Sequence, residues 1–375
     1  MPAPDPDLIA APTTSPIRVA LEPAQNALNS LLLLDKADKL SGLGEWVTRT
    51  AAALTPEQRH NNRLVLYGLY YAVTPDQSWP SFPAYVNHLA DQDPTTLRNH
   101  VFNAYAQMRR GRRENGEHCL IPDPASGQVP IDIAPLLENV DTFLEFLLEG
   151  FPAKSIDPEI ESEAHRYLND PPAMQSLIVS HLRSMWEEVL EPEWERVVPV
   201  LQASTDAFQQ LNLSNLSKPE AAKLVLGQEP EECWKAEFEQ AEKIIFVPST
   251  HVGPYIGQFK FGGTLWILFG ARIPEGVQIH APDLSRAEII VRINALADDT
   301  RLRILRLVSE GGEQCSHDIR TRLELSQSAV SRHLKQLSAT GYLNERRCNG
   351  AKCYTLNPKR IKDTLRAISL FLLGN

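Results

Sequence analysis

The stretch LELSQSAVSRHLKQLSATGYLNERR, residues 323–347, decides the fold of the C-terminal part of the chain. Val330, Leu334 and Leu337 follow one another at spacings of four and three, which places them on one face of an α-helix. Short hydroxyl, amide and basic side chains occupy the opposite face. Ser326 is of a residue type that caps helix N-termini. The stretch therefore predicts an amphipathic helix that begins just after Ser326.

The segments around this helix predict a small domain. Before it, Asp298 and Ser316 can cap two further helices, and a tight turn at Leu325-Ser326 leads into the amphipathic helix. After it, the alternating runs YLNERR and KCYTLN flank Asn349-Gly350, a dipeptide typical of two-residue hairpin turns. A last helix is expected from Pro358 onward. The order helix, helix, turn, helix, hairpin predicts a winged helix-turn-helix.

In a helix-turn-helix the second helix of the pair enters the major groove of DNA. Arg and Gln side chains, such as that of Gln336, can hydrogen-bond to the edges of bases. Ser and Lys side chains can contact phosphates or bases. A solvated amphipathic helix in a bundle would show the same polar face, but the element order, the hairpin and the local positive charge favour DNA binding. The predicted DNA-binding residues are Ser326, Gln327, Ser328, Ser331, Arg332 and Lys335 on the helix, and Arg346, Arg347 and Lys352 on the hairpin.

Charge is divided unevenly along the chain. Of the 37 Lys and Arg and the 47 Asp and Glu residues, 16 and 9 lie in residues 284–375. This segment therefore has a net charge of +7, whereas the rest of the chain has a net charge of −17. A basic module on an acidic body indicates that only the module binds a polyanion such as a nucleic acid.

The runs LADDTRLRILRLV and LSQSAVSRHLKQLSATGYL, together with the hairpin, resemble the ArsR/SmtB family of bacterial winged-helix repressors. The resemblance covers residues 285–375. It implies transcription regulation by a homodimer that binds an inverted-repeat operator in double-stranded DNA, and repression that ends when an effector binds. It also implies a dimer interface made by the first and last helices of the module, where Ile361, Leu365, Ile368 and Phe371 form an apolar stripe.

The resemblance extends in part to the metal sites of the family. Its arsenic and cadmium sensors carry Cys-x-Cys-Asp-Leu before the turn, where this chain reads Cys315-Ser316-His317-Asp318-Ile319. A Cys/His pair suits zinc or another thiophilic metal, so Cys315 and His317 are the predicted metal ligands. Two ligands are too few for a closed site, and the alternative is a buried Cys beside an exposed His. Zinc or another thiophilic metal ion is the one cofactor that the sequence suggests.

Two further cysteines, Cys348 and Cys353, flank the hairpin turn. Hairpin geometry can place such residues across from each other, which makes them a candidate redox pair. The alternative is two incidental thiols in a reducing cytoplasm. The odd number of five cysteines at irregular spacing favours a cytoplasmic protein with reduced thiols. The sequence contains neither a signal-peptide pattern nor an apolar run that could span a membrane.

Three regions are predicted along the chain, and the fold class is mainly α with small β elements. Residues 1–20 form a Pro-rich, disordered lead-in, and residues 283–375 form the winged helix-turn-helix. Residues 21–282 form a mostly helical N-terminal domain with short strands near residues 243–272. Helix starts are indicated at Thr55, with Gln58 completing a capping box, and at Asp93 and Asp170.

The N-terminal domain is predicted to be sensory or to support dimerisation, and a small-molecule effector is its expected partner. The sequence contains no GxSxG, HExxH, P-loop or CxxC motif, so it does not indicate an enzyme. The alternative is an enzyme or protein-interaction body that uses its winged helix for docking. The turn-rich run HVGPYIGQFKFGG, residues 251–263, is expected to connect the body to the winged helix.

Overall fold

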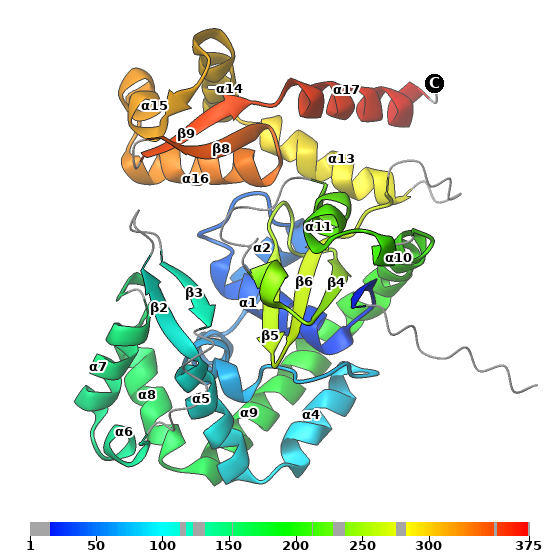
Figure 1. Ribbon diagram of the computed structural model, residues 1–375. Helices are drawn as coiled ribbons and strands as arrows, with labels where there is room; N and C mark the ends of the chain where they lie inside the picture. The colour runs from blue at the N-terminus through cyan, green and yellow to red at the C-terminus, as the bar shows by residue number, and fades with distance from the viewer. Residues whose placement is uncertain are drawn as a thin grey trace, which may run out of the picture.

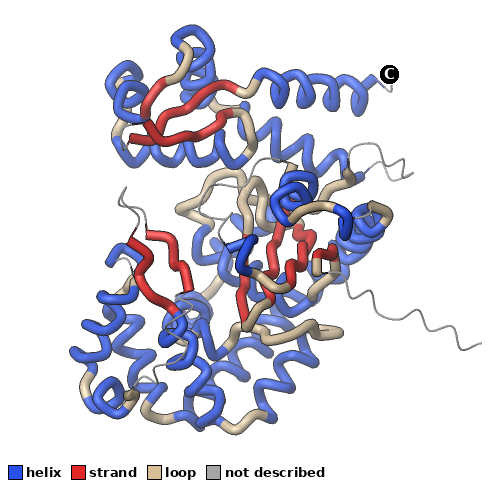
Figure 2. Tube along the Cα trace, viewed as in Figure 1, coloured by secondary structure: helices blue, strands red, loops and turns tan. Residues whose placement is uncertain are grey.

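The computed structural model describes residues 16–112, 118–122, 132–151, 153–211, 213–227, 237–274, 283–348 and 351–373. A helical body surrounds a four-stranded sheet, and the last helices with a small three-stranded sheet form a layer above it (Figure 1). Helices predominate over short strands (Figure 2), which confirms the predicted fold class.

The helices of the body begin largely where the sequence predicts. Thr55 and Gln58 form the capping box, Asp93 Oδ1 accepts from the Thr96 amide at 2.8 Å, and Asp170 caps the helix that follows it. The α-helices are α1 Pro23–Lys36, α2 Glu45–Ala53, α3 Pro56–Arg63, α4 Phe82–Asp91, α5 Pro94–Gln107, α6 Ala134–Glu138, α7 Val140–Gly150, α8 Pro158–Leu168, α9 Pro171–Met185, α10 Glu191–Gln209 and α11 Lys218–Leu226. Short 3-10 and π turns are η1 Leu64–Gly68, η2 Tyr70–Ala72, η4 Ala153–Ser155, η5 Trp186–Leu190 and η6 Leu213–Asn215.

The central sheet lies in the body and has the strand order β1-β4-β6-β5. Strands β1, β4 and β6 are parallel to one another, and β5 is antiparallel to β6. The strands expected near residues 243–272 are thus present, and the turn-rich run 251–263 contains one of them. The bounds are β1 Ile17–Val19, β4 Lys243–Ser249, β5 Gly257–Phe261 and β6 Thr264–Gly270.

Side chains from both faces of this sheet are buried. On β4, Ile245 and Val247 join the large apolar cluster of the N-terminal helices, whereas Ile244 and Phe246 join a second cluster that includes residues of α11. Burial on both faces explains why β4 and β6 read as continuous apolar runs rather than as alternating ones.

The winged-helix segment shows the predicted order of elements. It contains α13 Asp283–Leu296, α14 Asp299–Gly311, β7 Gln314–Cys315, α15 Ser316–Leu323, α16 Gln327–Ala339, β8 Leu343–Cys348, β9 Ala351–Leu356 and α17 Pro358–Leu373. The small sheet has the order β7-β9-β8. The turn predicted at Asn349-Gly350 lies outside the described residues.

Two local predictions about the body need correction. Residues 17–19, which the sequence places in a disordered lead-in, form β1. Their backbone pairs with the edge of β4, and the side chains of Ile17 and Val19 are buried. The Pro- and Gly-rich run IPDPASGQVP, residues 121–130, predicts a loop, but Ile121 and Pro122 end a strand of a separate hairpin, and residues 123–130 lie outside the described part. That hairpin, which the sequence did not suggest, consists of β2 Met108–Arg112 and β3 His118–Pro122.

Glu161 on α8 provides a test of the packing of the body. Its side chain is buried, its Oε2 atom lacks a hydrogen-bond partner among the described residues, and burial together with nearby Asp157 raises its pKa to about 7. Between its ordinary pKa of 4.5 and about 7, the folded protein therefore holds a proton that the unfolded chain releases. Stability is lost as the pH rises through this window.

We expect Glu161→Gln to raise the free energy of unfolding by about 2–3 kcal/mol at pH 8 and by about 1 kcal/mol or less at pH 5. Urea unfolding at the two pH values measures the difference. Glu159→Gln, an exposed position on the same helix, is the control and should give the same small change at both. An equal effect of Glu161→Gln at both pH values would contradict the assignment.

Candidate nucleic-acid interface

The turn of the helix-turn-helix lies between Leu323 and Gln327. Glu324, which follows α15, has a φ of 54° and is the only non-glycine residue with positive φ in the described part of the chain. This left-handed residue reverses the chain sharply at the end of α15. Ser326 then caps α16, and its Oγ accepts from the Ala329 amide at 3.2 Å. The predicted cap and the predicted turn are both confirmed.

The apolar face of α16 fixes the orientation of the helix. Val330, Leu334 and Leu337 are buried in one cluster with Ile304 of α14 and Ile319 of α15. Because these three positions face inward, the remaining positions of the first turns of α16 face outward. The side chains of Ser326, Gln327, Ser328, Ser331, Arg332 and Lys335 are all exposed.

Arg301 has a structural function that the sequence analysis did not identify. Its side chain is buried, and it donates from Nε to the Ala295 carbonyl at 2.6 Å and from Nη2 to the Asn294 carbonyl at 2.7 Å. Asp298 in turn accepts from the Arg301 amide at 2.9 Å. These bonds satisfy the last carbonyls of α13 and join α13 to α14.

The three basic residues of the hairpin differ in their contacts and their exposure. Arg346 forms a bidentate ion pair with Glu313, and Lys352 Nζ lies 2.6 Å from Glu345. Arg347 is half-buried. The helix residues thus form one exposed group, whereas Arg346 and Lys352 of the hairpin are bound to neighbouring carboxylates.

Gln336 does not face outward, which corrects the helical-wheel prediction. Its side chain is 1% exposed, and its amide oxygen accepts a hydrogen bond from the Ser41 hydroxyl of the body. The ammonium group of Lys335 lies 5.6 Å above the ring of Tyr255, whose hydroxyl donates to the Ser41 carbonyl at 2.8 Å. The C-terminal half of α16 is therefore held against two loops of the body.

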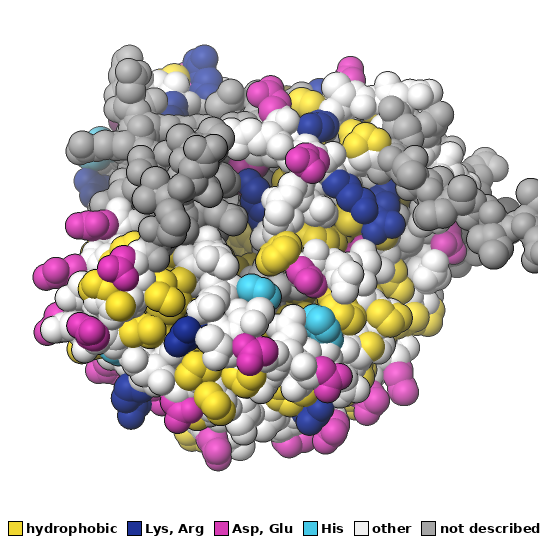
Figure 3. All heavy atoms as spheres, turned by 60° about the horizontal axis from the view of Figure 1, so that its bottom comes forward, with side chains coloured by type: hydrophobic (Ala, Val, Ile, Leu, Met, Phe, Trp, Pro, Cys, Tyr) yellow, Lys and Arg dark blue, Asp and Glu magenta, His cyan; other side chains and the backbone are white. Residues whose placement is uncertain are grey.

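The figures show the same arrangement at larger scale. Helix α16 lies on the side of the winged helix that faces the body, above α2 (Figure 1). Over the lower part of the body, the described Asp and Glu side chains are spread around the rim with fewer Lys and Arg side chains among them (Figure 3). This distribution agrees with the charge difference between the two parts of the sequence.

Residues 298–345 match the family model described as "Bacterial regulatory protein, arsR family". The chain is 37% identical over 86 residues to the transcriptional activator HlyU of Vibrio cholerae, which covers 23% of this chain and 79% of that protein. The chain belongs to the ArsR family. The family assignment of residues 298–345 confirms the resemblance, and residues before them are not covered by the family model.

Two further relatives are regulators of arsenic resistance. The arsenic resistance transcriptional regulator ArsR1 of Pseudomonas putida is 45% identical over 64 residues, which is 17% of this chain and 50% of that protein. The arsenical resistance operon repressor of Escherichia coli is 46% identical over 63 residues, 17% of this chain and 54% of that protein. The chain thus spans about half the length of these two relatives. The similarities support a DNA-binding transcriptional regulator.

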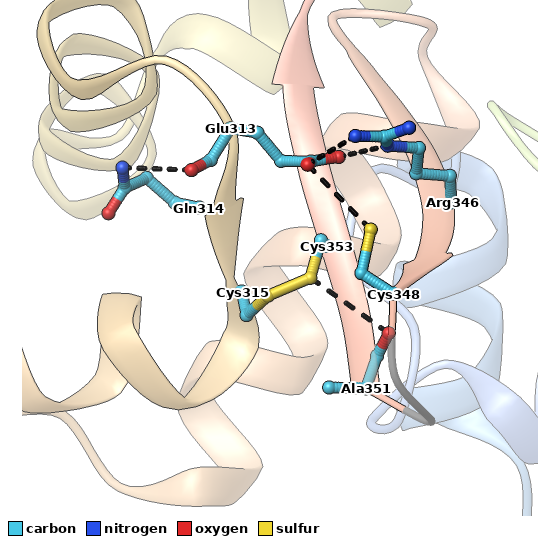
Figure 4. Close-up of a disulfide and its surroundings, with 7 residues drawn as sticks. All are labelled: Glu313, Gln314, Cys315, Arg346, Cys348, Ala351 and Cys353. Carbon is cyan, nitrogen blue, oxygen red and sulfur yellow. Dashed lines mark hydrogen bonds and ion pairs between the residues drawn. A yellow bond between two sulfur atoms is a disulfide. The ribbon is translucent and has the colours of Figure 1, made fainter.

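The cysteines of this ArsR-family member pair differently from the prediction. Cys353 of β9 forms a disulfide with Cys315 of β7, directly opposite it in the sheet (Figure 4). Cys348 remains a thiol and donates to Glu313 at 3.7 Å. The predicted Cys348–Cys353 pair does not form because the hairpin register places Cys348 opposite Ala351, two residues away from Cys353.

The disulfide also affects the predicted metal ligands. A metal-binding cysteine must be a thiolate, and Cys315 can supply one only after the disulfide is reduced. His317 is exposed, with its Nδ1 atom 3.3 Å from Arg320 Nη2. Within the described residues, no group of three or more His, Cys, Asp or Glu side chains is placed to hold a metal ion. In the same residues, no helix is both long and apolar enough to cross a membrane.

The body contains a buried Ser-His-Glu network that the sequence analysis missed because its members are far apart in the chain. The Ser30 hydroxyl lies 2.7 Å from His251 Nδ1, and His251 Nε2 lies 2.9 Å from Glu193 Oε1. Burial opposes the ionisation of Glu193, but hydrogen bonds from His251 and Arg196 hold its pKa below the usual value. The residue order Ser-His-Glu is that of a hydrolase triad, but the imidazole is reversed, because a triad has the serine at Nε2 and the carboxylate at Nδ1.

The surroundings of this network favour a structural function. Ser30 is 3% exposed, lies within α1 and donates to the Asn26 carbonyl at 2.7 Å. Trp46 stacks on His251 with ring centroids 4.4 Å apart. The adjoining cavity measures about 10 Å³, which is room for about one water molecule. The network therefore ties α1, α10 and the loop after β4 together.

The Cys315–Cys353 disulfide gives a stability prediction. It closes a segment of 38 residues between the strand before α15 and the wing. We expect reduction to lower the free energy of unfolding by about 2–4 kcal/mol, because the unfolded chain gains conformational freedom. Urea unfolding with and without dithiothreitol measures the change. The double variant Cys315→Ser, Cys353→Ser should be insensitive to dithiothreitol, while Cys348→Ser should behave like the parent; insensitivity of the parent would contradict the bond.

Proposed function

We propose that this protein represses transcription by binding operator DNA as a homodimer, and that a small-molecule effector held by the body releases it. One observation carries the DNA-binding part of this proposal: the polar residues on the first turns of α16 are exposed together, while the apolar face of the helix is buried. Any amphipathic surface helix has a polar face, but this one belongs to the second helix of a helix-turn-helix, beside a two-stranded wing and in a segment with a net charge of +7.

The chemistry of this group suits duplex DNA. Ser326 and Ser328 stand at the N-terminus of α16, where backbone amides and the helix dipole favour a phosphate. Arg332, one turn further along, can form a bidentate contact with guanine. Arg346 and Lys352 on the wing can exchange their carboxylate partners for phosphates. We assign base reading to the helix and positioning on the backbone to the wing.

Exposed apolar residues on two neighbouring helices support the homodimer. Leu365 and Phe371 of α17 are 59% and 45% exposed, and Ile290 and Ile293 of α13 are also exposed. In Figure 1 these two helices run side by side. Burying such side chains against a second copy would remove them from water. The interface would then be the one expected from the family resemblance.

Repression, rather than activation, is supported by the resemblance to the arsenical resistance operon repressor, although a transcriptional activator is also among the relatives. Release by an effector is supported by the contact between α16 and the body. Because the body holds the C-terminal half of the DNA-reading helix, any ligand that changes this contact changes access to DNA. The proposed sensor is therefore the body, and we expect no requirement for a metal at Cys315 and His317.

The first test is an electrophoretic shift with the DNA upstream of the protein's own coding sequence. A shuffled duplex of equal length and composition is the control. Retention of the upstream fragment at concentrations that leave the shuffled duplex free supports sequence-specific binding. Equal binding to both would contradict an operator in this fragment.

Arg332→Ala should cost about 1–3 kcal/mol of operator affinity and relax discrimination at one base position, because a guanidinium contact to a base edge is lost. Arg306→Ala on α14, which lies across the module from α16 in Figure 1, is the control. Fluorescence anisotropy measures the operator affinity of the two variants and the parent. Measured at several salt concentrations, the logarithm of the parent's binding constant should fall with the logarithm of the salt concentration at a slope of about −5 if about six phosphates are contacted. An equal loss on operator and shuffled DNA would make Arg332 a phosphate contact instead.

Leu365→Glu should weaken self-association by about 100-fold or more, because a two-fold interface buries the new charge twice. Sedimentation velocity at micromolar concentration should then show a monomer for the variant and a dimer for the parent. Lys362→Glu, an exposed position on the same helix, should remain dimeric. A monomeric parent protein would contradict the homodimer.

A further inference from the structure

A cavity of about 100 Å³ lies where the body meets the winged helix. Its floor is formed at the carboxyl ends of β4 and β6, by Ser249, Thr250 and Phe269–Arg272. The carboxyl edge of parallel strands is the usual place for a ligand in an open α/β sheet. The opposite wall comes from the winged helix, through Glu288 and Arg292 of α13 and Arg360 of α17.

Three arginines surround a single carboxylate in this cavity. Arg292 donates to Glu288 Oε1, and Arg360 Nη2 lies 3.8 Å from the same oxygen. Arg272 also acts on Glu288, while its guanidinium donates to the carbonyls of Leu224 and Val225 at 2.7 and 2.8 Å. Among the described residues, Arg292 and Arg360 thus share Glu288 as their ion-pair partner.

The pKa directions reflect burial and the closeness of the arginines to one another. Burial and the neighbouring Arg292 lower the pKa of Arg360 to about 10, with a contribution from Arg272. Burial disfavours the ionised form of Glu288, yet the three arginines hold its pKa below the usual value. An added anion would relieve the repulsion among the guanidinium groups.

Two buried donors at the cavity lack acceptors. Arg292 is 8% exposed, and its Nε atom has no hydrogen-bond partner within the described part of the chain. The same holds for the buried Oγ1 atom of Thr250, a residue that lines both this cavity and the smaller one beside His251. A buried donor without an acceptor is costly, so a ligand oxygen between these walls would be stabilised.

Apart from Ser249, Tyr255 and Thr340, the rest of the cavity lining is apolar. Leu226, Ile256 and Phe269 line it on the body side, and Val291 lines it on α13. An inorganic phosphate would contact the arginines but would leave these apolar walls without a partner. A ligand with one carboxylate and a small apolar part would satisfy both.

We infer that this cavity binds a small monocarboxylic acid, with its carboxylate toward Arg292, Arg360 and Thr250 and its apolar part against Leu226, Ile256 and Phe269. Because the walls come from both the body and the winged helix, the ligand binds the docked arrangement more tightly than a separated one. This docked arrangement holds Gln336 and Lys335 against the body, so ligand binding lowers operator affinity. The last step rests on the proposed function, whereas binding itself does not.

Isothermal titration calorimetry on the full chain tests the site with benzoate and 3-methylbutanoate as probes. Benzamide, which has the shape of benzoate without its charge, and inorganic phosphate are the comparison compounds. We expect at least one carboxylate to bind about ten-fold or more tightly than either comparison compound. Binding of benzamide or phosphate as tight as that of both carboxylates, or no binding of either carboxylate, overturns the inference.

Two variants locate the binding. Arg292→Gln removes the guanidinium, and Thr250→Val removes one donor with almost no change of shape, so the second variant remains informative if the first unfolds. Each should weaken carboxylate binding, Arg292→Gln by about ten-fold or more. Arg303→Gln, an exposed position on α14, is the control and should bind like the parent. Parental affinity in both cavity variants would place the ligand elsewhere and overturn the inference.

The link to regulation is measured separately, by adding the bound carboxylate to the operator-binding assay. Weaker operator binding by the parent, but not by Thr250→Val, supports the coupling. Carboxylate binding without any change in operator affinity overturns the coupling and leaves the site itself supported. Failure of the chain to bind any DNA contradicts the proposed function, while the calorimetric result still decides the site.

Discussion

The parallel pairing of β4 with β6 fixes where the body meets the winged helix. Since the two strands run in the same direction, the loops that follow them leave the sheet at one edge. The loop after β4 carries Tyr255, which reaches α16, and the segment after β6 carries Arg272, which reaches the cavity beneath α13. These two contacts between the parts of the molecule therefore depend on the direction of two buried strands, whereas the Ser41–Gln336 contact comes from the loop after α1.

The close approach of two loops makes the docking possible. Gly253 has a φ of 58°, and a Cβ atom there would lie 2.5 Å from the Gly42 carbonyl oxygen. Gly42 itself has a φ of 87°, and a Cβ atom there would lie 2.7 Å from Gln336 Nε2. Only glycine fits these two positions without strain. The docking surface also brings two like charges near each other, Lys36 of the body and Lys335 of α16. Burial and the charge of Lys335 lower the pKa of Lys36. A contact with such a cost is suited to opening.

Much of the winged helix could be predicted from the sequence because its signals are local. Ser326 caps the helix that follows within three residues, and Val330, Leu334 and Leu337 mark its buried face by their spacing alone. The disulfide was not predictable in the same way, since Cys315 and Cys353 meet through the order of three strands. Gln336 faces the body rather than solvent because its partner, Ser41, is 295 residues away in the chain. A helical wheel contains no information about such a neighbour.

The body shows the same division between local and distant signals. Three helix N-termini of the body, at Thr55, Asp93 and Asp170, could be predicted from their capping residues. The parallel direction of β4 and β6 could not, because it depends on how the connection between them crosses the sheet. The arginine cluster likewise could not be predicted from the sequence, because Arg272, Arg292 and Arg360 come from three separate segments of the chain.

The two halves of α16 have different surroundings, and the proposed regulation rests on this difference. The N-terminal half presents Ser328 and Arg332 to solvent, while Lys335 and Gln336 near the other end contact the body. A helix is stiff over three turns, so fixing one end restricts the direction of the other. In the proposed regulation, the body therefore controls the reading of DNA without covering Ser328 and Arg332. A ligand acts on this equilibrium only through its unequal affinity for the docked and separated arrangements, and a cavity walled by both parts provides that inequality.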